Sequence, residues 1–174
     1  MLGWGSPVDV QLPEISVRVG QLIDLDEAFA VWHAAIMAWR PSRALSHERD
    51  AQERNAARMP DAFLLIAEES GMIVGMALTM HEQAQDGDGP LIPGHCYISL
   101  VEVAPDRWGQ GIGRRLVNAV LSEAKQRGYI CARLWTERAN QRAQRLYASC
   151  GFYQTGRERD DEAGERIIQY ERAV

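Results

Sequence analysis

The chain has 174 residues, of which 46% are hydrophobic and 25% charged, with a formal net charge of −5 at pH 7. This composition is that of an ordinary globular domain, and the length predicts one domain that buries about 70% of its unfolded surface. The apolar fraction excludes disorder, and no run approaches the roughly 18 apolar residues of a membrane span. The acidic balance argues against a nucleic-acid binder.

The first ten residues have neither a basic start nor an apolar run, which predicts no secretory signal and a cytoplasmic protein. The cysteines Cys96, Cys131 and Cys150 are odd in number and lack the spacing of metal ligands. We therefore expect reduced, mostly buried thiols and no bound metal.

The first half of the chain predicts a strand, two helices and a strand pair. Residues 1–14 contain several Gly and Pro residues and little pattern, so we expect an irregular arm before a single domain at 15–174. Residues 15–19 alternate as a half-buried strand does, and helical spacing over 25–39 predicts a helix that Pro41 ends. A more polar helix is expected over 46–59, followed by hairpin strands at 62–68 and 72–81.

The second half begins with residues 82–94, which are rich in Gly, Pro and Asp and predict a long loop, a candidate lid. A strand is expected at 95–104, then a glycine-rich turn and a helix with an apolar face from Leu116 to Ala124 that Gly128 caps. The remaining elements are a strand (129–136), a helix (140–150) and two strands (152–159 and 166–172). This order predicts a mixed α/β domain with a central hairpin meander.

The most informative segment is the glycine turn, residues 108–114, which reads Trp-Gly-Gln-Gly-Ile-Gly-Arg between the predicted strand and helix. Glycine permits positive φ and the close approach of an anion, and a helix N-terminus offers unpaired N–H groups. The turn therefore predicts a phosphate site. It lacks the Lys and Ser/Thr of a P-loop and the G-x-G-x-x-G spacing of a dinucleotide site. A turn that only tightens a strand–helix junction is the alternative.

Two segments resemble the GCN5-related N-acetyltransferase (GNAT) family. Residues 108–113 resemble the motif R/Q-x-x-G-x-G/A, with Trp108 where Arg or Gln is commoner, and residues 140–152 resemble N-x-x-A-x-x-x-Y-x-x-x-G-F. The resemblance covers roughly residues 15–172. It implies a mostly antiparallel central sheet of about seven strands with a splayed parallel pair, flanked by about four helices.

The resemblance also implies an N-acetyltransferase that moves the acetyl group of acetyl-CoA to a primary amine by direct attack in a ternary complex. Val101 and Val103 would offer backbone groups to the pantetheine arm of CoA, and Asn140 would bond the same arm. The pyrophosphate would be held by Trp108, Gly109, Gln110, Gly111, Ile112, Gly113 and Arg114.

Tyr147 would be the general acid toward the departing thiolate, because a phenol with a pKa of about 10 is protonated at neutral pH. The alternative is a core residue at helical spacing with Ala143 and Leu146. The general base is not identified, because Trp135 stands five residues before Asn140, where some relatives carry a basic glutamate. The candidates for the base are a water chain, Glu102, Glu137, His81 and His95. Glu102 alternates with two valines in the predicted strand, so it is alternatively a residue that faces solvent.

Three groups of side chains each have two interpretations. Trp32, Ile36 and Trp39 are core residues or a pocket wall, and Met72, Met76 and Met80 are core residues or an adaptable wall of the acceptor site. Asp160, Asp161 and Glu162 form a solvated turn or attract a cationic amine. The acceptor itself, a small-molecule or peptide amine, is not identified. A homodimer is a common expectation for such proteins, and no nucleic-acid or membrane partner is expected.

The alternative function is a non-catalytic acyl-CoA-binding sensor or regulatory module. An enzyme that uses a longer acyl group or an alcohol acceptor is a third interpretation. The charge distribution favours a CoA-type ligand. Residues 107–145 contain nine basic and two acidic residues, a net charge of +7, which leaves −12 for the rest of the chain. The basic block suits polyanionic CoA, and the acidic remainder suits a cationic acceptor.

Overall fold

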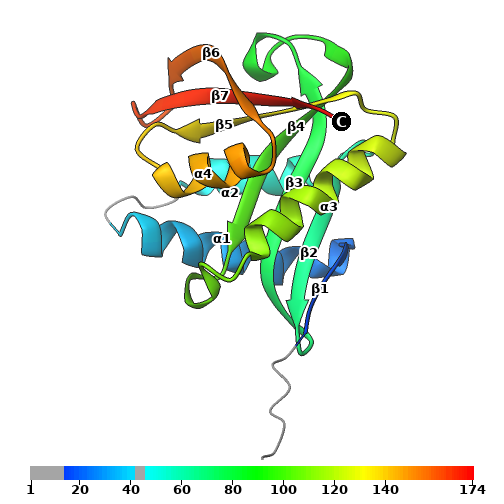
Figure 1. The fold of residues 1–174 in the computed structure, drawn as a ribbon, viewed down its shortest axis with the longest axis vertical. Coiled ribbons are helices and arrows are strands. Elements are labelled where there is room, and N and C mark those ends of the chain that lie inside the picture. The colour runs from blue at the N-terminus through cyan, green and yellow to red at the C-terminus, as the bar shows by residue number, and fades with distance from the viewer. Residues whose placement is uncertain (1–13, 42–45) are drawn as a thin grey trace, which may run out of the picture.

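The computed structural model describes residues 14–41 and 46–174. Within them, one sheet has the strand order β1-β2-β3-β4-β5-β7-β6, and its neighbouring strands are antiparallel except for the parallel pair β4 and β5 (Figure 1). The strands are β1 (Ile15–Val19), β2 (Phe63–Glu69), β3 (Met72–Gln83), β4 (Leu91–Val103), β5 (Cys131–Glu137), β6 (Tyr153–Asp160) and β7 (Arg166–Ala173). Apart from Glu14, the arm predicted at 1–14 lies outside the described residues.

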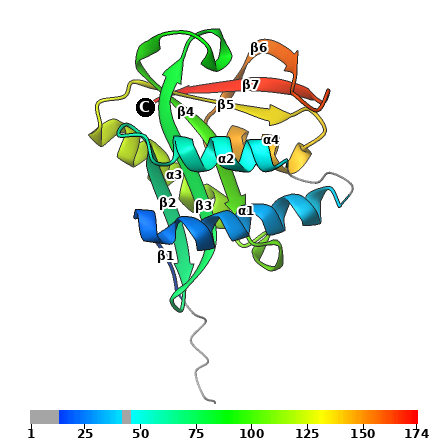
Figure 2. The same ribbon diagram turned by 180° about the vertical axis from the view of Figure 1, so that it is seen from behind.

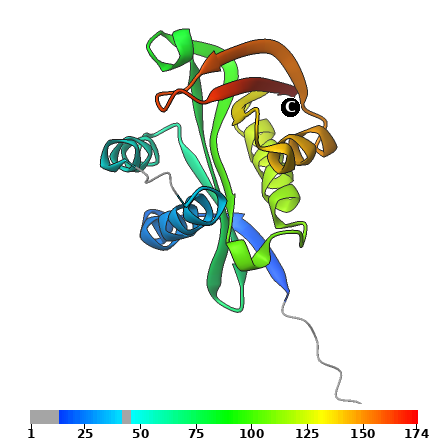
Figure 3. The ribbon, with the colours of Figure 1, turned by 90° about the vertical axis from the view of Figure 1, so that its left-hand side faces the viewer.

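Helices cover both faces of the sheet. The α-helices are α1 (Leu25–Trp39), α2 (His47–Ala56), α3 (Ile112–Gln126) and α4 (Gln141–Ser149). Figures 2 and 3 show α1 and α2 on one face, and α3 and α4 on the other. The predicted order of helices and strands and the predicted fold class are confirmed.

Each face of the sheet has its own apolar cluster, because side chains alternate between the faces along a strand. On the α3 side, Leu116 and Val117 are buried against Ile98 of β4 and Leu134 of β5. On the α1 side, the cluster is built on Phe29, Trp32, Ile66, Met76 and Leu78. Truncating a fully buried residue such as Leu116 to Ala would cost about 2–5 kcal/mol.

Polar contacts, and not apolar burial, hold α2 in place, since none of its residues is buried. Its N-cap Ser46 accepts a hydrogen bond from the Arg49 N–H at 3.1 Å. Both carboxylate oxygens of Glu53 lie 2.7 Å from the Ser99 hydroxyl on β4. The side chain of Glu53 therefore ties the C-terminal half of α2 to β4.

The loop predicted over residues 82–94 is wrong in extent. Strand β3 continues to Gln83 and β4 begins at Leu91, and these two residues pair, so only residues 84–90 connect the strands. Pro93 lies inside β4, but the pairing with β5 begins at His95. The missing N–H of Pro93 therefore interrupts no part of that pairing.

Candidate active site

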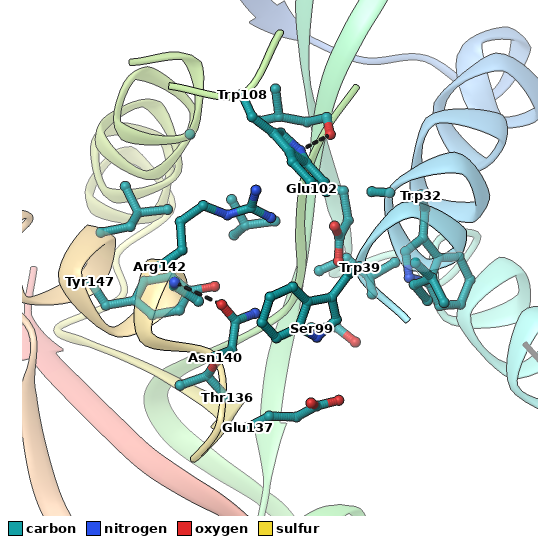
Figure 4. A pocket seen from close by; sticks show the side chains of 18 of the residues that line it. Trp32, Trp39, Ser99, Glu102, Trp108, Thr136, Glu137, Asn140, Arg142 and Tyr147 are labelled. Atoms are coloured by element: carbon teal, nitrogen blue, oxygen red, sulfur yellow. Dashed lines mark hydrogen bonds between the residues drawn. The ribbon is translucent and has the colours of Figure 1, made fainter. Parts of the chain in front are cut away.

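A pocket lies between β4 and β5. The two strands pair over residues 95–97 and 131–133 and separate beyond them. The separation opens a pocket of about 1060 Å³ whose walls come from β4, β5, the glycine turn and the helices α1, α2 and α4 (Figure 4). Backbone groups that would have paired across the gap are available to a ligand.

A β-bulge in β4 places Glu102 in this pocket. The pairing with β3 steps from Leu78–Leu100 to Thr79–Ile98, so Ser99 is an extra residue in β4. As a result, Ile98 packs on the α3 side of the sheet and Leu100 on the α1 side. Glu102, two residues beyond Leu100, shares the α1 side and lines the pocket near Trp32 and Trp39 (Figure 4).

The glycine turn forms an open backbone concavity at one end of the pocket. Gly109 and Gly111 have φ values of 82° and 79°, and a Cβ on either would meet nothing within 4 Å. Gly111 is the N-cap of α3, whose first turn contains no acidic side chain. The first N–H groups of α3 and the positive end of its dipole therefore suit an anion, and the residues present fit the phosphates of CoA.

Most of the predicted phosphate-binding residues line this end of the pocket, but Gln110 is exposed and does not. Ile112 is 1% exposed and packs in the α3-side cluster, so its backbone is the part available to a ligand. A Cβ on Gly113 would lie 3.1 Å from Leu146 Cδ2. Glycine at this position therefore lets α3 approach α4 closely.

Val101 and Val103 direct their backbone groups into the gap between β4 and β5. The Ala104 N–H donates to the Val74 carbonyl of β3 at 2.9 Å, and successive residues of a strand direct these groups to opposite edges. The Val103 carbonyl accepts a 2.8 Å hydrogen bond from Trp108 Nε1. In this structure, the acceptor of Val103 is thus occupied by the indole, whereas Val101 borders the pocket directly.

The indole ring of Trp108 is also in contact with a cationic side chain. Arg142 of α4 lies with its guanidinium carbon 3.6 Å from the centroid of the Trp108 ring, a cation–π contact (Figure 4). Burial lowers the pKa of Arg142, and the nearby charge of Glu102 opposes this effect. Sequence reasoning missed Arg142, although its position two residues after Asn140 in a helix facing the glycine turn was a usable signal.

Tyr147 serves both as a core residue and as a pocket residue. It is 7% exposed, its ring packs against Phe152 and Tyr170 at centroid distances of 5.9 and 6.1 Å, and it lines the pocket. Burial, followed by the charge of Glu102, raises the pKa of Tyr147 well above its ordinary value. The phenol therefore remains protonated through the neutral range.

Asn140 is the N-cap of α4 and lines the same pocket. Its Oδ1 accepts a 3.0 Å hydrogen bond from the Ala143 N–H (Figure 4). The side-chain NH₂ group remains as the donor that a ligand could use.

Among the predicted bases, the structure brings two carboxylates and neither histidine into the pocket. Burial raises the pKa of Glu102 to about 8, against the opposing charges of Arg142 and Arg49. Glu137 also lines the pocket and pairs with Arg40 at 2.8 Å.

The two histidines lie outside the residues that line this pocket. His81 Nε2 is 2.8 Å from the Ile92 carbonyl oxygen, and His95 Nδ1 is 3.3 Å from a carboxylate oxygen of Glu82. Both therefore have structural partners on the β3–β4 hairpin.

The opposite end of the pocket, here called the hairpin end, lies between the helices α1 and α2 and the β6–β7 turn. Trp39 of α1 is 37% exposed there, and Glu162 of the β6–β7 turn faces the same space as Glu48 and Arg49 of α2. Trp32 lines the pocket from within the α1-side cluster, so both interpretations hold for this aromatic face. The acidic turn borders the pocket through Glu162.

The methionines of β3 do not line the pocket. Met76 is buried in the α1-side cluster, Met80 packs against it, and Met72 is 56% exposed beside the hairpin turn. Core packing is therefore the correct interpretation for Met76 and Met80.

Within residues 14–41 and 46–174, no group of three or more His, Cys, Asp or Glu side chains is placed to hold a metal ion. No helix in this part of the chain is long and apolar enough to cross a membrane. The three cysteines are free, with Cys96 and Cys150 buried and Cys131 half-buried. Burial raises the pKa of Cys96 to about 12.

A parted parallel pair beside a glycine turn that suits an anion, with α4 across the gap, is the arrangement expected of a CoA-dependent acyltransferase. The chain matches the acetyltransferase (GNAT) family over residues 29–152 and belongs to that family.

The chain is similar to mycothiol acetyltransferases. It is 35% identical over 145 residues to that of Thermobispora bispora, a match that covers 82% of this chain and 48% of the relative. It is 33% identical over 150 residues to that of Propionibacterium freudenreichii subsp. shermanii, with coverage of 84% and 46%. The chain thus spans about half the length of the curated relatives it matches.

Two solved structures show the same fold. The ribosomal-protein-S18-alanine N-acetyltransferase of Escherichia coli superposes with a TM-score of 0.71 at 19% identity, covering 92% of this chain and 94% of that one. The yncA protein of Salmonella typhimurium, solved with its cofactor acetyl-CoA, has a TM-score of 0.71 at 20% identity, with the same coverage.

Proposed function

We propose that this chain is an acetyl-CoA-dependent N-acetyltransferase that moves the acetyl group to a primary amine within a ternary complex. One observation carries the proposal: the gap between β4 and β5 has the glycine turn at one end and places the phenol of Tyr147 and the carboxylate of Glu102 on its two sides (Figure 4). A candidate anion site, a candidate proton donor and a candidate proton acceptor therefore share one pocket.

The donor would bind at the glycine-turn end. Backbone N–H groups of Gly111 to Arg114 would bond the pyrophosphate, each contributing about 1.5–3 kcal/mol as charge-assisted hydrogen bonds do. The pantetheine arm would run along the open edge of β4, with Val101 and the Asn140 NH₂ group as partners. These residues fit the donor because the Cβ positions of Gly109 and Gly111 are open and no acidic side chain lies in the first turn of α3.

In the reaction, Glu102 would accept a proton from the acceptor ammonium, directly or through a water molecule, so that the amine nitrogen can attack the thioester carbonyl carbon. A pKa of about 8 suits this role, because a general base works best when its pKa lies near the operating pH. The Val103 N–H would stabilise the charge on the carbonyl oxygen. As the carbon–nitrogen bond forms and the carbon–sulfur bond breaks, Tyr147 would donate its proton to the leaving thiolate. The nitrogen still carries two protons after the attack, and it would lose one of them to the Tyr147 phenolate as the amide forms. Glu102 would then release its proton to water.

The acceptor would enter at the hairpin end, where Glu48 and Glu162 favour a cation and Trp39 offers an apolar surface. The names of two similar relatives, both mycothiol acetyltransferases, favour a mycothiol-type amine. At 35% identity over 82% of the chain, they make this the first acceptor to test.

The test is CoA thiol release from acetyl-CoA over a panel of primary amines that includes the unacetylated form of mycothiol. We expect release with at least one amine and a loss of release in Tyr147→Phe. Acetyl-CoA binding by calorimetry with no release from any amine would favour the non-catalytic sensor instead.

A further inference from the structure

The arginines that line the pocket differ in how their charges are balanced. Arg40 pairs with Glu137, and Arg107 pairs with Glu69 at 2.8 Å. Arg142 lies on the aromatic face of Trp108 and has no carboxylate within ion-pair distance in the part of the chain that the structure describes. An aromatic face attracts a guanidinium without neutralising it. Arg142 therefore keeps a full positive charge inside the pocket.

The position of Trp108 is itself fixed by the hydrogen bond from its indole to the Val103 carbonyl. The GNAT motif commonly has Arg or Gln where this chain has Trp108. Here the side chain at this position is aromatic, and the positive charge beside it comes from α4. The Trp108–Arg142 stack thus brings a cation from one side of the gap to the β4 side, where Glu102 lies (Figure 4).

The group that faces this cation is Glu102, whose carboxylate has no hydrogen-bond donor among the described residues. The charged groups that act on it come from three elements: Arg142 on α4, Arg49 on α2 and Glu137 on β5, with Arg142 the strongest of the three. The buried phenol of Tyr147, also on α4, faces Glu102 as well. An opposite charge nearby favours the ionised form of a carboxyl group.

We propose that Arg142, held against Trp108, is a positioning residue for the reaction: its unneutralised charge raises the ionised fraction of the Glu102 carboxyl group, so that more of the enzyme can take the proton of the acceptor. The inference rests on the proposed function, in which Glu102 is the base. It makes α4 the source of the proton donor, Tyr147, and of the charge that governs the proton acceptor.

The test is a ¹³C NMR titration of glutamate side-chain carboxyl groups in the free protein, with Glu102→Gln assigning the Glu102 resonance. We expect a midpoint near 8 in the unchanged protein and a midpoint about one pH unit higher in Arg142→Gln. Arg142→Lys should restore most of the shift, because the ammonium keeps the charge. Arg145→Gln is the matched control, since it removes the same charge from α4 one turn further along.

An unchanged midpoint in Arg142→Gln, or an equal shift in Arg145→Gln, would overturn the inference. Activity separates this failure from failure of the proposed function. If Glu102→Gln turns over as fast as the unchanged enzyme, the proposed base and the inference both fail. If Glu102→Gln is slow and Arg142→Gln leaves the midpoint in place, only the inference fails. If both hold, Arg142→Gln is about tenfold slower at pH 7, because a rise from 8 to 9 reduces the ionised fraction by that factor.

Discussion

Replacing Gly111 with Ala separates the two properties of the glycine turn, its backbone strain and its open surface. At a φ of 79°, an alanine pays about 1–2 kcal/mol for the left-handed conformation. Nothing lies within 4 Å of the new Cβ, so no clash adds to this cost. For a domain of this size, 1 kcal/mol lowers Tm by about 2–4 °C, so we expect a fall of about 2–8 °C.

The effect on CoA binding should be larger than the effect on folding. Gly111 lines the pocket at the N-terminus of α3, and the methyl group would stand where the pyrophosphate is proposed to lie. Losing one charge-assisted hydrogen bond of about 1.5–3 kcal/mol raises the Kd for CoA about 10- to 150-fold. Isothermal titration with CoA measures this change.

Gly128 is the matched control. Its φ is 84°, a Cβ there would also meet nothing within 4 Å, and it lies beyond the C-terminus of α3, away from the pocket. Gly128→Ala should therefore lower Tm by a similar amount and leave the Kd for CoA unchanged. If the two variants bind CoA equally well, the glycine turn is not the phosphate site and the reasoning is refuted.

Four further outcomes are expected. Tyr147→Phe keeps the packing of the ring, so CoA affinity should stay within about twofold while turnover falls by at least about 100-fold in the thiol-release assay; unchanged turnover would exclude the acid role. Because burial raises the folded-state pKa of Glu102 to about 8, kcat/KM should rise with pH toward a plateau above 8, and a limb that persists in Glu102→Gln would contradict this. The same raised pKa means that the folded state binds the Glu102 proton more tightly than the unfolded state does. The contribution of this group to the free energy of unfolding is therefore fully present below pH 4.5 and is lost as the pH rises through 8. Urea unfolding of Glu102→Gln should show a flatter pH dependence of stability over that range. Single Ala variants of Cys96, Cys131 and Cys150 should each keep most of their turnover, and a loss of all activity in one of them would argue for a covalent acyl-cysteine route.

The sequence predicted the element order and the glycine turn because both depend on local rules. Helical and strand periodicity mark the elements, and the alternating glycines mark a turn with positive φ. The role of Asn140 at the start of a helix follows the same kind of rule, and its capping bond to Ala143 is present. These features need no knowledge of distant contacts.

The position of Glu102 could not be predicted, because it depends on a bulge that strict alternation does not foresee. With plain alternation, Ile98, Leu100 and Glu102 would share one face of β4. The extra residue Ser99 instead puts Ile98 on the α3 side and moves Leu100 and Glu102 to the α1 side. Only the pairing with β3 reveals this shift.

The loop over 82–94 and the contact between Trp108 and Arg142 show the same limit. Composition favoured a loop, but pairing with β3 extends the strand through Pro93. The Trp108–Arg142 contact joins residues that are 34 positions apart in the chain, and it exists because α4 packs across the gap from the glycine turn. Such contacts follow from the tertiary arrangement.

The two ends of the pocket differ in how far the fold depends on their side chains. At the glycine-turn end, Ile112 and Tyr147 are wall and core at once, so a change there disturbs folding together with binding. At the hairpin end, Glu48 and Glu162 are exposed and belong to neither apolar cluster. Substitutions at the hairpin end, where the acceptor is proposed to enter, should therefore cost little stability, whereas substitutions at the glycine-turn end should cost more. If the proposed function holds, the protein can change its acceptor without changing how it binds acetyl-CoA.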